Sequence, residues 1–222
     1  MLRRWSPWLL WLLLSAVIVG AFLDSTRPGE GFLGETGRIL YFHVPNAWAS
    51  FVAFVAAGAW SLAYLFGRRA PEHDRKAAAA VELGLLFCVL ATVTGAIWAK
   101  VQWGAFWNWD PRQTSITLAL LFYAAYLALR GAVEDGGTRS RLAAAYAALG
   151  LVVAPFLFFV LPRITYSLHP QPVVNLQGKI EMARPMLVVL LAGAGAFTAL
   201  FFWLHDLRWR AEALQDGGRS NP

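Results

Sequence analysis

The residues with the clearest capacity for chemistry lie between positions 103 and 112, where aromatic and charged side chains are concentrated. Trp103, Trp107 and Trp109 fall within seven residues, and Asp110 and Arg112 follow them. A membrane protein commonly places one or two tryptophans at each water–lipid boundary as anchors. This segment exceeds that need, so it predicts a flat aromatic surface that receives a ligand.

Helical spacing divides the aromatic side chains of this segment into two groups. Trp103, Phe106 and Trp107 stand at positions i, i+3 and i+4, so a short helix would place them on one face. Trp109 is rotated away from that face, and we expect it to pack into the protein. Pro111 disfavours a helical backbone at Asp110. We therefore predict a short helix along the membrane interface, with two tryptophan faces available to a ligand.

Two of the four histidines can accompany this surface. His43 directly precedes Val44-Pro45, and proline suits the first turn of a helix, so we expect the imidazole at the lip of that helix. His169 precedes Pro170, which favours an extended backbone at the histidine. Two histidines beside an aromatic surface can supply both axial nitrogens of a haem iron. The alternative is a pair of interfacial histidines that bond loop carbonyls.

Haem propionates would also need cations on the same side. Arg38 and Arg112 are candidates, because a guanidinium binds a carboxylate through two parallel hydrogen bonds. Each has an alternative role, since Arg112 could pair with Asp110 and Arg38 could contact a lipid headgroup. For Asp110 we favour a structural role, in which it orients an indole N–H or a backbone turn.

The elements that position these residues are membrane helices. Of the 222 residues, 58% are hydrophobic and 14% are charged. About 20 apolar residues in a helix cross the hydrocarbon core of roughly 30 Å. Six runs come near or exceed this length: 5–23, 44–66, 81–99, 113–130, 142–162 and 185–205. We expect an all-α integral membrane fold, with one six-span domain over 1–212 and a polar, disordered cytoplasmic tail over 213–222.

Basic residues orient the predicted spans. With the N-terminus inside, the inner segments hold twelve Lys and Arg residues and the outer segments hold seven. The positive-inside rule then predicts that both termini are cytoplasmic, and it places His43, His169 and the tryptophans outside. His73 and His205 fall inside, where we expect ordinary surface roles. The bases are scattered through short loops, so a nucleic-acid partner is not expected.

Absent motifs exclude several activities. The only cysteine, Cys88, lies within a predicted span, and no CxxC or CxxCH is present, so haem would not be held by thioether bonds. The chain also has no GxxxxGK[ST], HExxH or GxSxG motif and no paired-carboxylate site. We expect a protein that is not an enzyme, and any energy input must come from a partner.

These features together resemble the haem-handling proteins of cytochrome c biogenesis, which carry a tryptophan-rich "WWD" signature. Residues 103–115 read W-G-x-x-W-x-W-D-x-R-x-T-S. Residues 41–45, Tyr-Phe-His-Val-Pro, are similar to the histidine motif before the family's second span, and residues 167–169, Ser-Leu-His, to its later outer histidine. Six spans in 222 residues match the short branch, the haem exporter C proteins of cytochrome c maturation. One departure is Thr165-Tyr166, where the family often has aromatic residues including tryptophan, so the pocket wall near His169 is left unassigned.

The resemblance implies a function that spacing alone does not. Members hold haem b, transiently and without a covalent bond, on the outer face of the bacterial inner membrane. They load it onto a membrane-anchored haem chaperone, in a complex with an ABC-type ATPase, its membrane subunit and a small helical membrane subunit. Carried over by residue, the resemblance assigns His43 and His169 as axial ligands. It also assigns Trp103, Trp107 and Trp109 as the haem-contacting signature, with Phe106 on the same platform. Asp110 and Arg112 belong to the signature without an assigned individual role.

Two other functions stay open on the sequence. A b-type cytochrome subunit would pass electrons through a permanent haem, but such haems usually bind histidines deep within spans, and none lies deep within a run here. A permease subunit without a cofactor would use the tryptophans only as an interfacial belt. That reading leaves unexplained why His43 and His169 both flank them.

Overall fold

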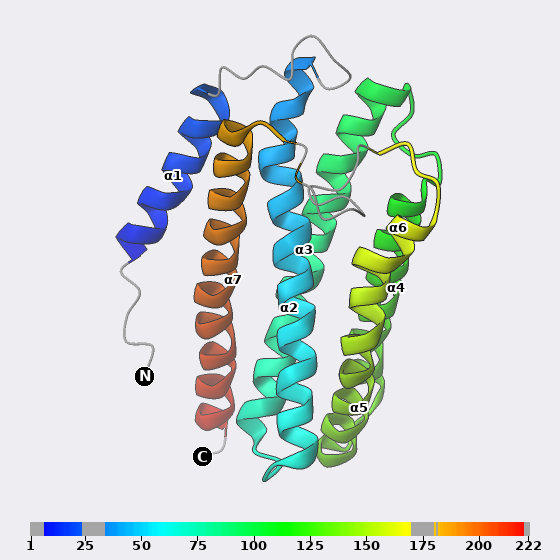
Figure 1. The fold of residues 1–222 in the computed structure, drawn as a ribbon. Coiled ribbons are helices and arrows are strands. Elements are labelled where there is room, and N and C mark those ends of the chain that lie inside the picture. The colour runs from blue at the N-terminus through cyan, green and yellow to red at the C-terminus, as the bar shows by residue number, and fades with distance from the viewer. Residues whose placement is uncertain (1–6, 24–33, 170–179, 181, 220–222) are drawn as a thin grey trace.

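The computed structural model describes residues 7–23, 34–169, 180 and 182–219. This part of the chain is almost entirely helical and contains no β-strand. Its main helices are α1 (Pro7–Leu23), α2 (Leu40–Phe66), α3 (Pro71–Trp103), α4 (Pro111–Ala132), α5 (Gly136–Pro155) and α7 (Arg184–Arg219). A 3-10 turn, η1 (Gly34–Ile39), leads into α2, and α5 continues through a π-helical turn, η2 (Phe156–Val160), into the short α6 (Leu161–Ile164). The helices alternate in direction, so the start of α2, the end of α3, the start of α4 and the end of α6 share one end of the bundle (Figure 1).

The predicted class is confirmed, because five helical segments are long and apolar enough to cross a membrane. They are Thr36–Phe66, Pro71–Trp103, Pro111–Ala132, Gly136–Ile164 and Arg184–Gln215. The first predicted span corresponds to α1, which is apolar but has only 17 residues. At 1.5 Å per residue it is roughly 26 Å long, shorter than a hydrocarbon core of about 30 Å. The sixth crossing, the cytoplasmic termini and the single-domain organisation stay predictions.

The C-terminal helix differs from the prediction of a disordered tail from residue 213. Helix α7 continues to Arg219, and only residues 220–222 of that tail lie outside the described residues. Ala, Glu, Leu and Gln at 211–215 are strong helix formers. Two ion pairs at i, i+4 spacing, Arg208–Glu212 at 3.6 Å and Arg210–Asp206 at 2.9 Å, add further support. Polarity alone was a poor guide to disorder here.

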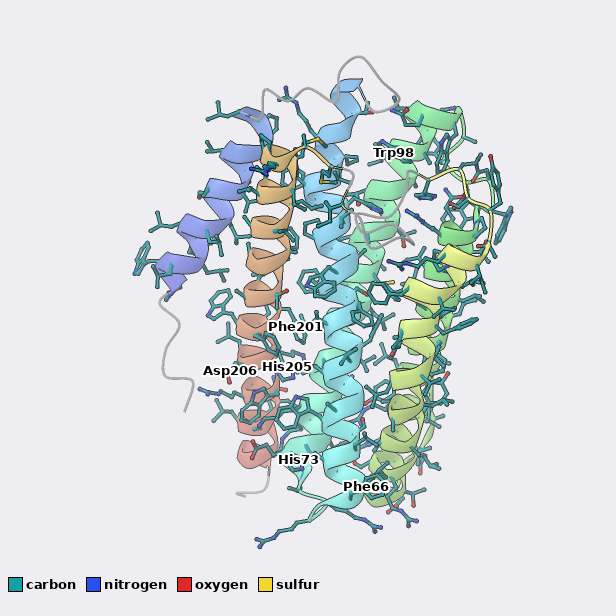
Figure 2. All side chains as sticks on the ribbon, in the orientation of Figure 1. Phe66, His73, Trp98, Phe201, His205 and Asp206 are labelled. Atoms are coloured by element: carbon teal, nitrogen blue, oxygen red, sulfur yellow. The ribbon has the colours of Figure 1, made fainter. Side chains whose placement is uncertain are left out.

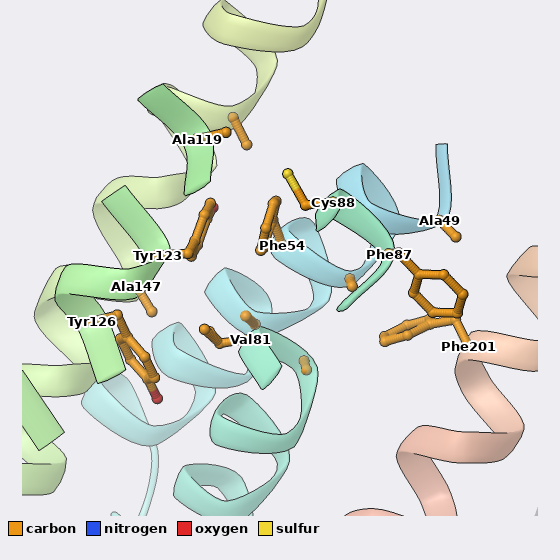
Figure 3. Close-up of a cluster of buried hydrophobic side chains, with 14 of the residues drawn as sticks. Ala49, Phe54, Val81, Phe87, Cys88, Ala119, Tyr123, Tyr126, Ala147 and Phe201 are labelled. Atoms are coloured by element: carbon orange, nitrogen blue, oxygen red, sulfur yellow. The ribbon is translucent and has the colours of Figure 1, made fainter. Parts of the chain in front are cut away.

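Small side chains allow the central helices to pack closely. On α2 the fully buried residues at four-residue spacing are Ala49, Ala53 and Ala57. Small residues let helix backbones approach each other in a membrane, where there is little hydrophobic drive between helices. At the centre, Phe54 of α2 and Tyr123 of α4 stack with ring centroids 3.5 Å apart (Figure 3). A Cβ added to Gly84 of α3 would lie 2.5 Å from the Phe54 ring, so only glycine fits there.

A partly buried ion pair joins three helices at the end of the bundle remote from the predicted haem site. The Arg130 guanidinium on α4 donates two hydrogen bonds to the Asp74 carboxylate on α3, at 2.6 and 3.1 Å. The Ser140 hydroxyl on α5 donates to the same carboxylate at 2.9 Å. Only 11% of the Asp74 side chain and 15% of the Arg130 side chain are exposed. The pair therefore positions α3, α4 and α5 at this end.

Replacing Asp74 with Asn should destabilise the fold, because it leaves the Arg130 guanidinium partly buried without an anion. We expect a loss of about 3 kcal/mol, measured as a lower midpoint of thermal unfolding in detergent. The matched control is Asp206→Asn, whose pair with Arg210 is largely exposed and is worth less than about 1 kcal/mol. Equal shifts in the two variants would contradict the structural role of Asp74.

Candidate functional site

The tryptophan-rich segment is an irregular connection between α3 and α4, and the predicted interfacial helix is wrong. Helix α3 ends at Trp103, and Gly104 adopts a left-handed backbone with φ of 78°. The Gly104 N–H donates to the Lys100 carbonyl at 3.1 Å, and the Lys100 ammonium donates to the Gly104 carbonyl at 2.8 Å. Glycine favours this C-terminal cap because it has no Cβ to strain the left-handed conformation. Trp103 therefore lies on α3, while Phe106 and Trp107 lie beyond the helix.

The first turn of α4 holds the rest of this segment in place. Gln113, which is buried, accepts the Asn108 N–H at 3.0 Å and donates to the Phe106 carbonyl at 3.2 Å. Trp109 has a left-handed backbone, with φ of 59°, and 70% of it is exposed. The prediction that Trp109 packs into the bundle is therefore wrong. Its ring instead meets Trp107 edge to face, with centroids 5.8 Å apart, which leaves an aromatic pair at the surface.

Asp110 is the residue around which the site is built. Only 1% of its side chain is exposed. The carboxylate caps α4 by accepting the Arg112 N–H at 3.0 Å, which agrees with the favoured role in a backbone turn. It also accepts the Leu168 N–H at 2.7 Å and the Ser167 hydroxyl at 2.9 and 3.0 Å. A single buried acid thus ties the start of α4 to the segment that follows α6.

The remaining partner of Asp110 is His169, a contact that the sequence analysis did not find. The Nδ1 atom of His169 lies 2.7 Å from a carboxylate oxygen of Asp110. Burial lowers the pKa of His169 to about 4, although Asp110 opposes this change. Burial also opposes ionisation of Asp110, but the N–H groups of Arg112 and Leu168 and the charge of His169 outweigh it and lower the pKa of the carboxyl. Near neutral pH, Asp110 is an anion and His169 is neutral.

This protonation state determines which nitrogen of His169 can bind a ligand. A neutral imidazole carries one proton, and the neighbouring Asp110 anion holds that proton on Nδ1. Nε2 therefore keeps its lone pair. Metal-binding histidines commonly use this arrangement, in which a carboxylate orients the ring and increases its basicity.

The aromatic wall beside His169 comes from α3. The ring centroids of Trp103 and His169 are 4.8 Å apart, and the two rings are nearly perpendicular. The Trp98 ring centroid lies 5.9 Å from that of His169. Tyr166, from the segment that departs from the family pattern, is 88% exposed and is not part of this wall. Trp98 was missed because it lies inside an apolar run. The available signal was its place five residues before Trp103, near the end of α3 (Figure 2).

His43 lies in the first turn of α2 and contacts the same helix, α3. Its Nδ1 is 2.9 Å from the Ala91 carbonyl and 3.3 Å from the Thr94 hydroxyl. A carbonyl can only accept, so Nδ1 carries the proton and Nε2 is unprotonated in the neutral ring. A Cβ on Gly95 would lie 2.8 Å from Cε1 of His43, so the absence of a side chain there makes room for the ring. Because α2 begins at Leu40, Pro45 lies inside the helix and not in its first turn as predicted.

The structure places His43 and His169 along one part of α3. His43 contacts residues 91–95, and His169 contacts Trp98 and Trp103. Positive charge on Arg112 or on His43 lowers the pKa of His169, which places both groups within electrostatic range of it. The ligand roles of the two histidines stay predictions.

The two candidate cations occupy different positions. Arg112 is half-buried, and its guanidinium has no hydrogen-bond or ion-pair partner within the part of the chain that the structure describes. The alternative of a local side-chain pair with Asp110 is not seen. The contact between the two residues is instead the hydrogen bond from the backbone N–H of Arg112 to the Asp110 carboxylate. Arg38 lies beside α1, where it donates to the Phe22 carbonyl at 3.2 Å and stacks over the Phe22 ring. Of the two, Arg112 is the one next to Asp110 and His169.

Comparisons with known proteins agree with the resemblance noted from the motifs. The family described as "Heme exporter protein C" matches residues 1–221. The chain is 34% identical to the Heme exporter protein C of Bradyrhizobium diazoefficiens over 217 residues, which cover 98% of this chain and 82% of the relative. It is 30% identical to that of Rhodobacter capsulatus, over 94% of this chain and 86% of the relative. A ccmC-like mitochondrial protein of Marchantia polymorpha, named for cytochrome c biosynthesis, is 28% identical over 80% of this chain and 75% of its own length. The chain belongs to the heme exporter protein C family.

Proposed function

We propose that this protein binds haem as a transported substrate, at the end of the bundle where α3 and α4 meet, and presents it for transfer during cytochrome c maturation. The proposal rests first on the two anchored histidines. In both His43 and His169 an acceptor holds Nδ1, the Ala91 carbonyl in one and the Asp110 carboxylate in the other. Both Nε2 atoms are then free to bind iron, as a haem with two axial histidines requires.

The donor set suits an iron that a porphyrin already holds. A protein site for a bare transition metal commonly uses three or four side-chain ligands. No group of three or more His, Cys, Asp or Glu residues that could hold a metal ion occurs among the described residues. Two histidines would complete the coordination of a haem iron, because the macrocycle supplies the other four nitrogens.

The surroundings of the histidines suit the macrocycle and its propionates. Trp109 and Phe106 are exposed and Trp107 is half-buried, which provides an aromatic surface for a flat, apolar ligand. The indole N–H of Trp103 is buried and has no partner within the described segments. A buried donor of this kind is costly unless it meets an acceptor, and a propionate oxygen is one. Arg112, which is next to Asp110 and His169, would supply a cation for the propionate.

The names of its relatives support a proposal for the larger assembly in which this protein works. Its relatives are named as haem exporters and, in mitochondria, for cytochrome c biosynthesis. We propose that it resides in the bacterial inner membrane with its haem site on the outer face. Its partners would be a membrane-anchored haem chaperone, an ABC ATPase with its membrane subunit, and a small helical membrane subunit. The ATPase would drive release, since this chain has no nucleotide-binding motif.

A permanent b-type haem is the second candidate, and one observation favours it. His43 is half-buried between α2 and α3, much as the ligands of electron-transfer haems lie between helices. The His169 loop and the exposed tryptophans favour transfer instead. Purified protein that carries haem can be mixed with apomyoglobin: a presenting protein loses haem to it, whereas a permanent cytochrome retains its spectrum.

Removing either histidine ligand should abolish stable haem binding. We expect His43→Ala and His169→Ala to lower haem affinity at least tenfold, seen as loss of the Soret band at matched protein concentration. His73→Ala, at the opposite end of the bundle, should leave the spectrum unchanged. Unchanged spectra in both outer variants, with normal elution from a sizing column, would refute two-histidine ligation.

Replacing Asp110 with Asn tests the positioning role of the carboxylate. Asn is as good an N-terminal cap as Asp, so α4 should form, but the anion that holds the proton on Nδ1 of His169 is lost. We expect haem affinity to fall by roughly 10- to 100-fold.

The pH profile gives a second readout. Because the pKa of His169 is lowered to about 4, binding by the parent protein should stay constant as the pH falls from neutral and decline only near that value. A decline centred near 6.5, the ordinary histidine value, would contradict this environment.

Gly95→Ala separates ligand geometry from stability. The new methyl group would lie 2.8 Å from the His43 ring and displace it, while alanine improves helix propensity by about 1 kcal/mol. We expect weaker haem binding together with equal or greater thermal stability. Gly195→Ala on α7 is the control, because a Cβ there meets nothing within 4 Å. Normal haem binding by Gly95→Ala would remove the argument for His43.

A further inference from the structure

The end of the bundle opposite His43 and His169 contains a pocket between α2 and α5. Its volume is about 350 Å³, and its lining residues are Leu65, Arg69, Thr138, Arg141, Leu142 and Ala145. Phe66, the last residue of α2, marks this end in Figure 2. The lining combines two arginines and one threonine with three apolar residues.

The two arginines of this pocket are available to an anion. Neither the Arg69 nor the Arg141 guanidinium has a hydrogen-bond or ion-pair partner in the part of the chain described by the structure. Arg69 also has a left-handed backbone, with φ of 51°. That conformation is uncommon for a residue with a side chain, and here it belongs to the short connection between α2 and α3.

The charges around the pocket leave it positive. Arg68 and Arg139 lie next to the lining residues in sequence, and the acids near them in sequence are Glu72, Glu134 and Asp135. Glu72 already pairs with Lys76. The Asp135 carboxylate is already engaged, since it accepts the Thr138 N–H at 2.7 Å and caps α5. Arg69 and Arg141 are the only charged residues among the described residues that line this pocket.

An apolar stripe leads away from the arginines along α5. Its members follow helical spacing and are all exposed: Leu142, Ala145, Leu149 and Val152. On the adjacent α2, Leu62 is exposed and Leu65 lines the pocket. With the predicted spans in a membrane, we expect these side chains to face acyl chains and Arg69 and Arg141 to lie near the headgroups.

We propose that this pocket binds one anionic phospholipid, with its phosphate between Arg69 and Arg141 and an acyl chain along the α5 stripe. A soluble anion would use the arginines but would leave the apolar half of the lining without a role. Anionic lipids attract cations that border the cytoplasmic leaflet, which is where the predicted topology places this end. The site is independent of haem binding.

Native mass spectrometry of the full chain in neutral detergent tests this proposal. The probes are phosphatidylglycerol and phosphatidylcholine with identical acyl chains. We expect a first phosphatidylglycerol to bind at lower concentration than phosphatidylcholine. Arg69→Gln combined with Arg141→Gln should weaken that binding roughly thirtyfold. Each basic residue near an anionic lipid surface contributes about 1 kcal/mol to binding, and the loss of two such contributions corresponds to this factor.

The matched control removes the same charge at the same end, with Arg208→Gln and Arg210→Gln on α7, outside the pocket lining, and should bind phosphatidylglycerol as the parent does. Equal binding of the two lipids, or equal losses in the two double variants, would overturn a specific lipid site. Displacement of the lipid by millimolar inorganic phosphate would instead identify a soluble-anion site. A protein partner that protects Arg69 and Arg141 from phenylglyoxal in lipid-free detergent would also overturn the proposal.

Discussion

The buried carboxylate of Asp110 is the interaction on which the candidate site depends. A buried charge is costly unless hydrogen bonds replace its lost hydration. Here the start of α4 and the segment that follows α6 supply those bonds, through the N–H groups of Arg112 and Leu168 and the Ser167 hydroxyl. The same anion orients His169, so helix capping, loop closure and the choice of imidazole tautomer are consequences of one side chain.

Helix α3 is the second constraint, because it contacts both histidines. Its close packing against α2 depends on small residues such as Ala53, Ala57 and Gly84, and this packing holds His43 against Ala91 and Gly95. Gly104 then ends the helix directly after Trp103. Because α3 ends there, Trp103 lies beside His169 on the last turn of the helix. Trp107 and Trp109 follow in the irregular connection, nearer to the surface.

The two ends of the bundle differ in chemistry, although the same helices form both. One end gathers two histidines, a buried acid and exposed aromatic rings. The other is held by the Asp74–Arg130 pair and presents Arg69 and Arg141, which have no ion-pair partner among the described residues, beside an apolar stripe. Between the two ends, the helices pack through a core of small and aromatic side chains, among them Ala53, Phe54 and Tyr123.

Most of the fold could be predicted from the sequence, because a run of about 20 apolar residues in lipid satisfies its backbone only as a helix. The motifs likewise identified the family and selected His43, His169 and Asp110 before any contact was known. The conformation of residues 104–110 could not be predicted, since the i, i+3, i+4 spacing of Trp103, Phe106 and Trp107 is also compatible with a helix that Gly104 interrupts. The bond between Asp110 and His169 joins residues 59 positions apart. Periodicity carries no information about such a contact, so only the packing of α3, α4 and the segment after α6 could decide it.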